Sequence, residues 1–122
     1  MVDKSVHSPK GTHYLLECSG VDSSLLKNKD DLESILHQGA ENAGATVVQT
    51  VLHEFNPHGL SGVVVIAESH IAIHTWPEDS YAAIDIFTCG DELIAEAIYN
   101  ELIRLLKPST HTYQVINREP PK

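Results

Sequence analysis

The chain has 122 residues, of which 42% are apolar, and its formal charge at pH 7 is −9. This length predicts one globular domain (1–122), and the absence of any run of ~18 apolar residues argues against a membrane span. A negative chain without a basic cluster is unsuited to nucleic acid and better suited to a cationic small ligand. The eight histidines are scattered without metal-site spacing, so no metal is expected.

The N-terminal part predicts a tail, a strand and a helix. Residues 1–10 are polar, predict a loose tail and lack the apolar stretch of a secretory signal, which favours the cytoplasm. Thr12 to Cys18 is typical of a short strand. Small or apolar residues then recur at 32, 35, 36, 39, 40 and 43, one face of an α-helix that Asn28 or Asp30 caps and Gly44 ends.

The middle of the chain predicts four strands in succession. Apolar and β-branched residues fill the segments 45–54, 61–67, 70–76 and 81–88. Pro57 and Gly59 break the chain after the first of these segments, because proline lacks a backbone donor and glycine permits positive φ. Residues 77–80 predict a turn. We expect strands joined by such short connections to pair antiparallel.

A second helix and an edge strand complete the predicted order. Asp91 caps this helix, apolar positions 94, 97, 98, 102 and 105 form its stripe, and Pro108 stops it before a strand at 110–116. The order β-α-β-β-β-β-α-β predicts an α+β two-layer sandwich, with two helices on one face of a mainly antiparallel sheet. The run from Val63 to Ile66 is apolar on both faces, so we expect the bare face to be buried in a dimer.

The tripeptide Glu68-Ser69-His70 lies where two of these strands meet, and it contains none of the usual turn residues. Serine at such a point is most often part of an ordinary turn. The absence of Gly, Asn, Asp and Pro instead favours the hypothesis that Ser69 is the chemical centre, provided that a base and an acid lie near it.

Three residues are candidates for that chemistry. Apolar neighbours predict that His74 is buried and neutral, which suits either a base or a structural histidine. In a hairpin, Ser61 approaches His74 across the ladder. Cys89 ends a strand before a helix N-terminus, which lowers a thiol pKa, whereas Cys18 is interpreted as a buried apolar residue. A thiol enzyme built on Cys89 and His74 is conceivable but leaves Ser69 unexplained.

A further group, Phe55, Trp76 and Glu78, combines aromatic rings with a carboxylate at strand ends. Such a group holds a flat cation or a nucleoside by stacking and hydrogen bonding, although filling of the core or an interface explains the rings equally well. The remaining histidines show no partner pattern beyond solvated or capping roles: His7, His13, His37, His53, His58 and His111.

Long stretches of the chain closely resemble the small prokaryotic S-adenosylmethionine decarboxylases. The resemblance spans most of the chain and is far more specific than a short motif. It is carried by Ser61 to Glu78, by Tyr81 to Gly90, by His53 to Gly59 and by Gly44-Ala45-Thr46, and more weakly by Gly11-Thr12-His13.

The resemblance implies a self-processing enzyme with a pyruvoyl cofactor. The Ser69 hydroxyl attacks the carbonyl of Glu68, the peptide becomes an ester, and β-elimination separates a β chain, 1–68, from an α chain, 69–122. Residue 69 is left as dehydroalanine and hydrolyses to pyruvoyl, which forms a Schiff base with the amine of S-adenosylmethionine and withdraws electrons as carbon dioxide leaves.

Other roles are implied by position. His74 takes the Ser69 α-proton with the help of Ser61, and Cys89 returns a proton to the α-carbon of the substrate. The aromatic and acidic group at 55, 76 and 78 lines the nucleoside and sulfonium site. The family forms homodimers, and its product is the aminopropyl donor for polyamine, including spermidine, biosynthesis.

Two departures from the family pattern bear on the substrate. Thr12 stands where relatives carry a basic residue between glycine and histidine, and Asp79-Ser80 replaces a turn that often contains glycine. The first departure leaves a pyruvoyl decarboxylase of another amino acid, arginine or ornithine, as an alternative. A non-catalytic dimeric homologue is the alternative from another class.

Overall fold

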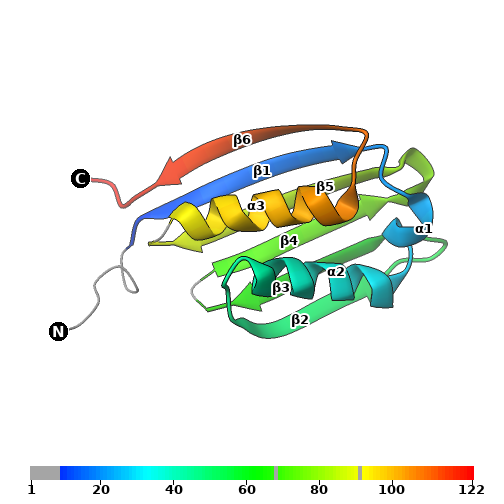
Figure 1. Ribbon diagram of the computed structural model, residues 1–122, viewed down its shortest axis with the longest axis horizontal. Coiled ribbons are helices and arrows are strands. Elements are labelled where there is room, and N and C mark those ends of the chain that lie inside the picture. Colours follow the sequence, from blue (N-terminus) through cyan, green and yellow to red (C-terminus); the bar gives the residue numbers. More distant parts are fainter. Residues whose placement is uncertain (1–8, 68, 91) are drawn as a thin grey trace.

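The computed structural model describes residues 9–67, 69–90 and 92–122, and its core element is one six-stranded antiparallel sheet (Figure 1). The strand order across the sheet is β2-β3-β4-β5-β1-β6. The strands are β1 (Gly11–Ser19), β2 (Val47–Glu54), β3 (Leu60–Ile66), β4 (Ser69–Trp76), β5 (Tyr81–Cys89) and β6 (Thr110–Arg118).

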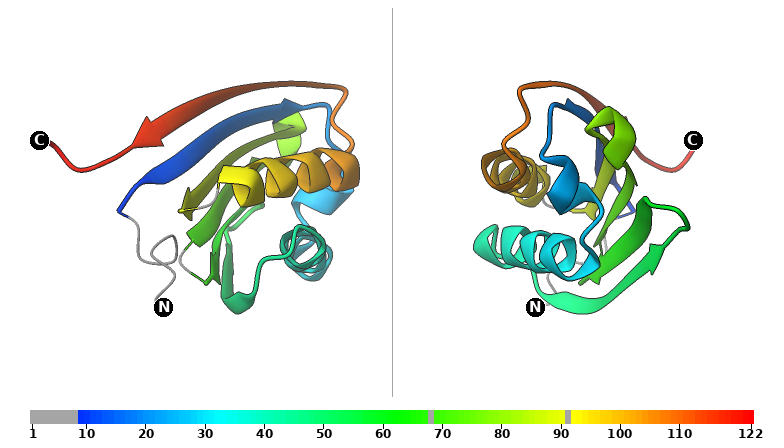
Figure 2. Two further views of the ribbon diagram at one scale, coloured as in Figure 1. Left: turned by 60° about the vertical axis from the view of Figure 1, so that its left-hand side comes forward. Right: turned by 90° about the vertical axis from the view of Figure 1, so that its right-hand side faces the viewer.

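Two long helices, α2 (Lys29–Asn42) and α3 (Glu92–Leu106), cover the same face of the sheet (Figure 2). No helix of the described residues covers the opposite face, which we call the open face. The predicted α+β sandwich is therefore confirmed, including the two helices on one side and the edge position of the last strand.

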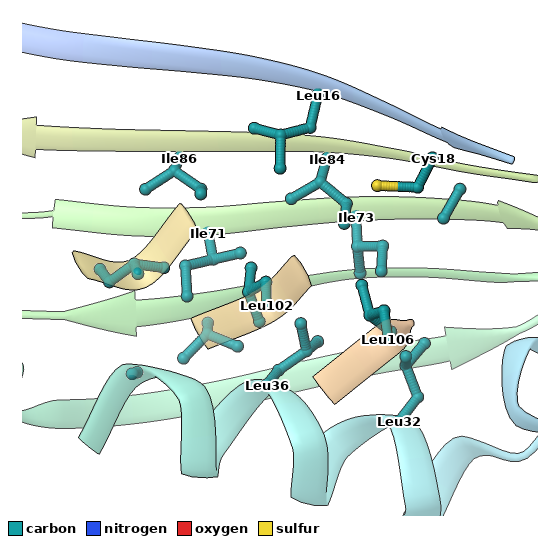
Figure 3. Packing of buried hydrophobic residues seen from close by; sticks show 14 of the residues in the cluster. Leu16, Cys18, Leu32, Leu36, Ile71, Ile73, Ile84, Ile86, Leu102 and Leu106 are labelled. Atoms are coloured by element: carbon teal, nitrogen blue, oxygen red, sulfur yellow. The ribbon is translucent and has the colours of Figure 1, made fainter. Parts of the chain in front are cut away.

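Strict alternation along the strands decides which face each side chain occupies. In β5, Ala82, Ile84, Ile86 and Thr88 are buried toward the helices, whereas the residues between them are half-buried. Ile71 and Ile73 of β4 are likewise fully buried. Figure 3 shows these isoleucines packed with leucines from both long helices. Because successive strand residues point to opposite faces, the odd residues of β4 build the core and the even residues line the open face.

Helix α2 follows from local sequence. The side chain of Asn28 accepts a hydrogen bond from the backbone amide of Asp31 at 3.1 Å, which caps the first turn. Gly44, with φ of 90°, supplies the left-handed residue after the helix. Gly39 lets α2 approach α3, since a Cβ there would lie 2.9 Å from a methyl carbon of Leu102. Of the two predicted caps, Asn28 and Asp30, the helix uses Asn28, and the predicted end of the helix is confirmed.

The structure differs from the sequence-based expectation in three details. A four-residue helix, α1 (Ser23–Leu26), fills the connection before α2, because the Asp22 side chain caps it. Ser69 is the first residue of β4 rather than a residue between strands. The buried residues of α3 are Ala95, Ile98, Leu102 and Leu106, so of the expected stripe only positions 98 and 102 are buried, and 94, 97 and 105 are half-buried. Residues 1–8 of the expected tail, 1–10, and the expected cap Asp91 lie outside the described residues.

Core packing predicts the effect of truncating a helix side chain. Leu36 is fully buried between α2 and the sheet, so we expect Leu36→Ala to lower the free energy of unfolding by about 2–5 kcal/mol, through lost burial and a cavity. Leu93 is 67% exposed, so Leu93→Ala should change it by less than about 0.5 kcal/mol. Chemical denaturation measures both values, and equal losses would contradict this account of the core.

Candidate active site

Ser69 begins β4 at a very tight hairpin. Its register partner is Ile66, the last residue of β3, so only residues 67 and 68 connect the two strands. The amide of Ala67 donates to the carbonyl of Thr46 at 3.0 Å and holds one side of the connection. Glu68, the residue expected to precede the scissile bond, lies outside the described residues. The half-buried Ser69 is thus fixed at the end of a strand pair.

Cys89 lies close to Ser69. Ser69 pairs with Thr88, the neighbour of Cys89 in β5, and both Ser69 and Cys89 line a cavity of about 160 Å³. The amide of Gly90 donates to the carbonyl of Lys10 at 3.0 Å, which holds the chain where it leaves β5. The start of β4 at Ser69 and the thiol of Cys89 therefore share one small cavity at this end of the sheet, which we call the cleavage end.

Ser61 and His74 form a direct pair elsewhere on the sheet. They are register partners in β3 and β4, and the Ser61 Oγ lies 2.7 Å from the His74 Nδ1. The hydroxyl fixes the orientation of the imidazole and leaves Nε2 toward the open face. The prediction that Ser61 approaches His74 across the ladder is confirmed.

His74 is exposed, so the expectation of a buried histidine is wrong. Its apolar sequence neighbours Ile71 and Ile73 point to the helix side of the sheet, whereas His74 points to the open face. The apolar residues next to it in sequence therefore do not enclose it.

Ser69 and His74 are far apart within one chain. Five residues along a strand span roughly 16 Å, and the two positions alternate between opposite faces of β4. A general base must come within about 3 Å of the proton that it takes. A protomer therefore cannot bring its own His74 to its own Ser69 while β4 stays intact.

The two rings of the predicted aromatic and acidic group, Phe55 and Trp76, lie at strand ends around His74, at what we call the aromatic end of the open face, and Glu78 follows β4 in the short 3-10 helix Pro77–Asp79. The Trp76 ring lies 6.4 Å from the His74 ring and stacks on Tyr81 at 5.1 Å. Phe55 is 52% exposed and contacts the His53 ring edge-on at 4.7 Å. Half-exposed rings at a sheet end are available for stacking on a flat ligand, which the predicted substrate site requires.

Tyr81 stabilises this end through a carboxylate. Its hydroxyl donates to Glu17, and that hydrogen bond, with a contribution from burial, raises the pKa of Tyr81 to about 12. The phenol therefore stays protonated at neutral pH. It holds a stacking partner under Trp76 and gives Glu17 a hydrogen bond on the open face.

Three residues of the aromatic end were not singled out from the sequence. His53 is the register partner of Ser61, and His58 Nε2 lies 3.3 Å from a carboxylate oxygen of Glu78. Tyr81 is the third. Hairpin register could have found His53 opposite Ser61 and Tyr81 opposite Trp76, whereas no pattern in the sequence points to His58, which lies in a loop.

Within the described residues, no group of three or more His, Cys, Asp or Glu side chains is arranged to hold a metal ion. No helix in these same segments is long and apolar enough to span a membrane.

Comparisons with known proteins agree on one class. A family model described as S-adenosylmethionine decarboxylase matches residues 12–119. An S-adenosylmethionine decarboxylase proenzyme of Thermoanaerobacter sp. (strain X514) is 45% identical over 108 residues, 88% of this chain and 87% of that protein. The proenzyme of the same name from Clostridium kluyveri (strain ATCC 8527 / DSM 555 / NBRC 12016 / NCIMB 10680 / K1) is 53% identical over 83 residues, 68% of this chain and 66% of the relative.

A solved structure shows the same fold. The crystal structure of the adenosylmethionine decarboxylase from Aquifex aeolicus VF5 superposes with a TM-score of 0.86 at 34% identity, covering 94% of this chain and 95% of that one. These matches place the chain among the decarboxylases. More narrowly, it belongs to the S-adenosylmethionine decarboxylase family, since the family model covers most of its length. The resemblance found in the sequence is confirmed.

The two cysteines should differ in reactivity. Burial, and to a lesser extent Glu17, raises the pKa of Cys18 to about 11, so at pH 8 only roughly one part in a thousand is thiolate. Cys89 is partly exposed at its cavity. We expect a disulfide reagent to modify one thiol per native chain. Cys89→Ser should abolish this reaction and Cys18→Ser should preserve it; two fast thiols in the native protein would contradict the assignment.

Proposed function

We propose that the chain is a proenzyme that cleaves itself between residues 68 and 69 and then decarboxylates S-adenosylmethionine, supplying the aminopropyl donor for polyamine synthesis. The observation that carries this proposal is the place of Ser69, at the start of β4 in a two-residue hairpin with Cys89 beside it. Cleavage would yield chains 1–68 and 69–122.

The surroundings of Ser69 fit a pyruvoyl group made from this residue. Its cavity is small and is lined by both polar and apolar atoms, among them Thr88 and Ile94, so it limits the water around an electrophile at this position. When present, the pyruvoyl carbonyl supplies an electron sink for decarboxylation. Cys89 is the residue placed to return a proton to the substrate carbon at this end of the sheet.

Cleavage needs a base that one protomer cannot supply to itself. The proposed base, His74, lies on the open face with Ser61, far from Ser69 of the same chain. We therefore propose a homodimer in which His74 of the partner subunit reaches the α-proton of Ser69. In this arrangement each site combines the cleavage end of one chain with the aromatic end of the other.

The composition of the open face supports such a dimer. Exposed apolar side chains lie on this face in strands from β2 to β6, and exposed apolar surface of this kind marks sites of protein association. They are Val51, Val63, Val65, Trp76 and Ile116. Two copies stacked through this face would cover these side chains and bring their sites between the sheets.

The aromatic end would bind the nucleoside and sulfonium parts of the substrate. Phe55 and Trp76 offer ring faces, Glu78 offers a carboxylate, and the chain carries a net charge of −9 that attracts a sulfonium cation. Two free cysteines suit the predicted cytoplasmic, reducing environment. Ornithine has no flat group to stack on these rings and arginine has only its guanidinium, whereas S-adenosylmethionine has an adenine in addition to its sulfonium.

Self-cleavage is tested directly by intact mass. We expect the purified protein to split into fragments 1–68 and 69–122 and to release carbon dioxide from S-adenosylmethionine but not from arginine or ornithine. Ser69→Ala should remain one folded, inactive chain, because it has no hydroxyl to attack the preceding carbonyl. Cys89→Ala, the matched control, should still cleave and lose decarboxylation by roughly 10²-fold or more. Uncleaved wild-type protein, or full turnover by Cys89→Ala, would contradict these roles.

The shared site predicts complementation between two inactive variants. Alone, Ser69→Ala should not cleave and His74→Ala should cleave poorly. Co-expressed, they form mixed dimers in which one site has both Ser69 and His74, so cleavage should appear only in the His74→Ala chain. Mass spectrometry of differently tagged chains identifies which one is cut. Cleavage of neither chain in a verified mixed dimer would show that the two groups do not meet across the interface.

A further inference from the structure

His58 contacts Glu78 across two loops at the aromatic end. The His58 Nε2 lies 3.3 Å from Oε1 of Glu78, and the two side chains are 38% and 51% exposed. Both line a cavity of about 320 Å³. The contact leaves the second oxygen of the carboxylate free to accept a hydrogen bond from a ligand.

The loop that carries His58 is held in place by backbone hydrogen bonds. The Phe55 amide donates to the carbonyl of Gly59 at 2.9 Å, which closes the loop after β2. Gly59 has φ of 109°, and a Cβ there would lie 3.2 Å from the carbonyl oxygen of Thr75, so only glycine fits this close approach comfortably. The loop therefore lies directly against the end of β4.

Thr75 joins this loop to the segment that carries Glu78. Its buried Oγ1 accepts from the Leu60 amide at 2.9 Å and donates to the Leu26 carbonyl at 2.8 Å. Three residues later, Glu78 lies in the short 3-10 helix Pro77–Asp79, which packs against α1. The buried Thr75 hydroxyl thus holds the start of β3, which follows the His58 loop, close to α1, against which the Glu78 segment packs.

We propose that His58 is a positioning residue that holds the Glu78 carboxylate in its ligand-binding orientation before substrate arrives. This inference rests on the proposed function, in which Glu78 contacts S-adenosylmethionine. A glutamate side chain has three rotatable bonds, and ordering it before binding removes that cost from the binding step. His58 therefore acts on substrate affinity and not on the chemical step. Lys27 lines the same cavity and adds positive charge near the carboxylate.

The test compares steady-state kinetics of the processed enzyme with S-adenosylmethionine. We expect His58→Leu, which has no donor, to raise KM roughly three- to tenfold with kcat within twofold, the size of a partly exposed hydrogen bond to a charge. His58→Gln keeps an N–H donor of similar reach and should restore most of the affinity. His37→Leu is the matched control, because His37 also pairs with a glutamate, Glu41, at 3.1 Å on α2.

A second set of variants, made in the Glu78→Gln enzyme, separates an effect on the orientation of the carboxylate from general damage to the fold. In Glu78→Gln enzyme, His58→Leu should add little further change in KM, since the carboxylate that it orients is gone. Thermal melts and cleavage yields confirm folding, and His58→Asn, whose amide is too short to reach, replaces His58→Leu if that variant does not fold.

Several outcomes would overturn the inference: an unchanged KM in His58→Leu, a loss confined to kcat, a defect in His58→Gln as large as in His58→Leu, or full additivity with Glu78→Gln. Failure of the proposed function looks different. Wild-type protein that does not decarboxylate S-adenosylmethionine at all would end both claims before any His58 variant is compared.

Discussion

The register between β3 and β4 is the constraint on which the site depends. It pairs Ile66 with Ser69 next to the hairpin connection, and it pairs Ser61 with His74 at the other end of the two strands. A shift of one residue would turn every side chain of β4 to the other face. Ser69 would leave its cavity, and His74 would enter the core without its hydroxyl partner. The buried side chains of Ile71 and Ile73 hold the register, because slipping would expose both.

Because successive residues of β4 point to opposite faces, one face of the strand builds the core and the other carries residues of the proposed site. Odd residues of β4 pack under the two long helices, whereas His74 and Trp76 face the open side. Thr75 is the polar residue on the buried side of β4. Its hydroxyl makes two hydrogen bonds, which connect the start of β3 with α1. A polar atom placed in the core thereby determines the geometry of an exposed site.

Much of this arrangement could be predicted from the sequence because it depends on local signals. Helical periodicity with a terminal glycine located α2, and runs of apolar and β-branched residues located the central strands. The meeting of Ser61 with His74 followed from assuming a hairpin and counting along it. The family resemblance implied roles that no spacing shows, such as the proposed use of Ser69 as the source of a pyruvoyl cofactor.

The features that were missed depend on which face or loop a residue occupies. Exposure of His74 was misjudged because its apolar neighbours in sequence lie on the opposite face of the strand. The contact of His58 with Glu78 joins residues twenty positions apart through the backbone around Thr75. Such a contact has no periodic signature, because it follows from how two loops pack.

The separation of Ser69 from His74 also decides between two ways of assembling the site. Bringing the groups together within one chain would break the β4 register and expose Ile71 and Ile73, each at a cost of about 1.5–3 kcal/mol in lost burial, besides the ladder hydrogen bonds. Pairing two chains through the open face breaks no register. It buries apolar side chains that are exposed in the protomer, including Val51, Val63 and Val65. For the proposed shared site, association is therefore the less costly route, and in the proposed dimer cleavage follows the assembly of two folded chains.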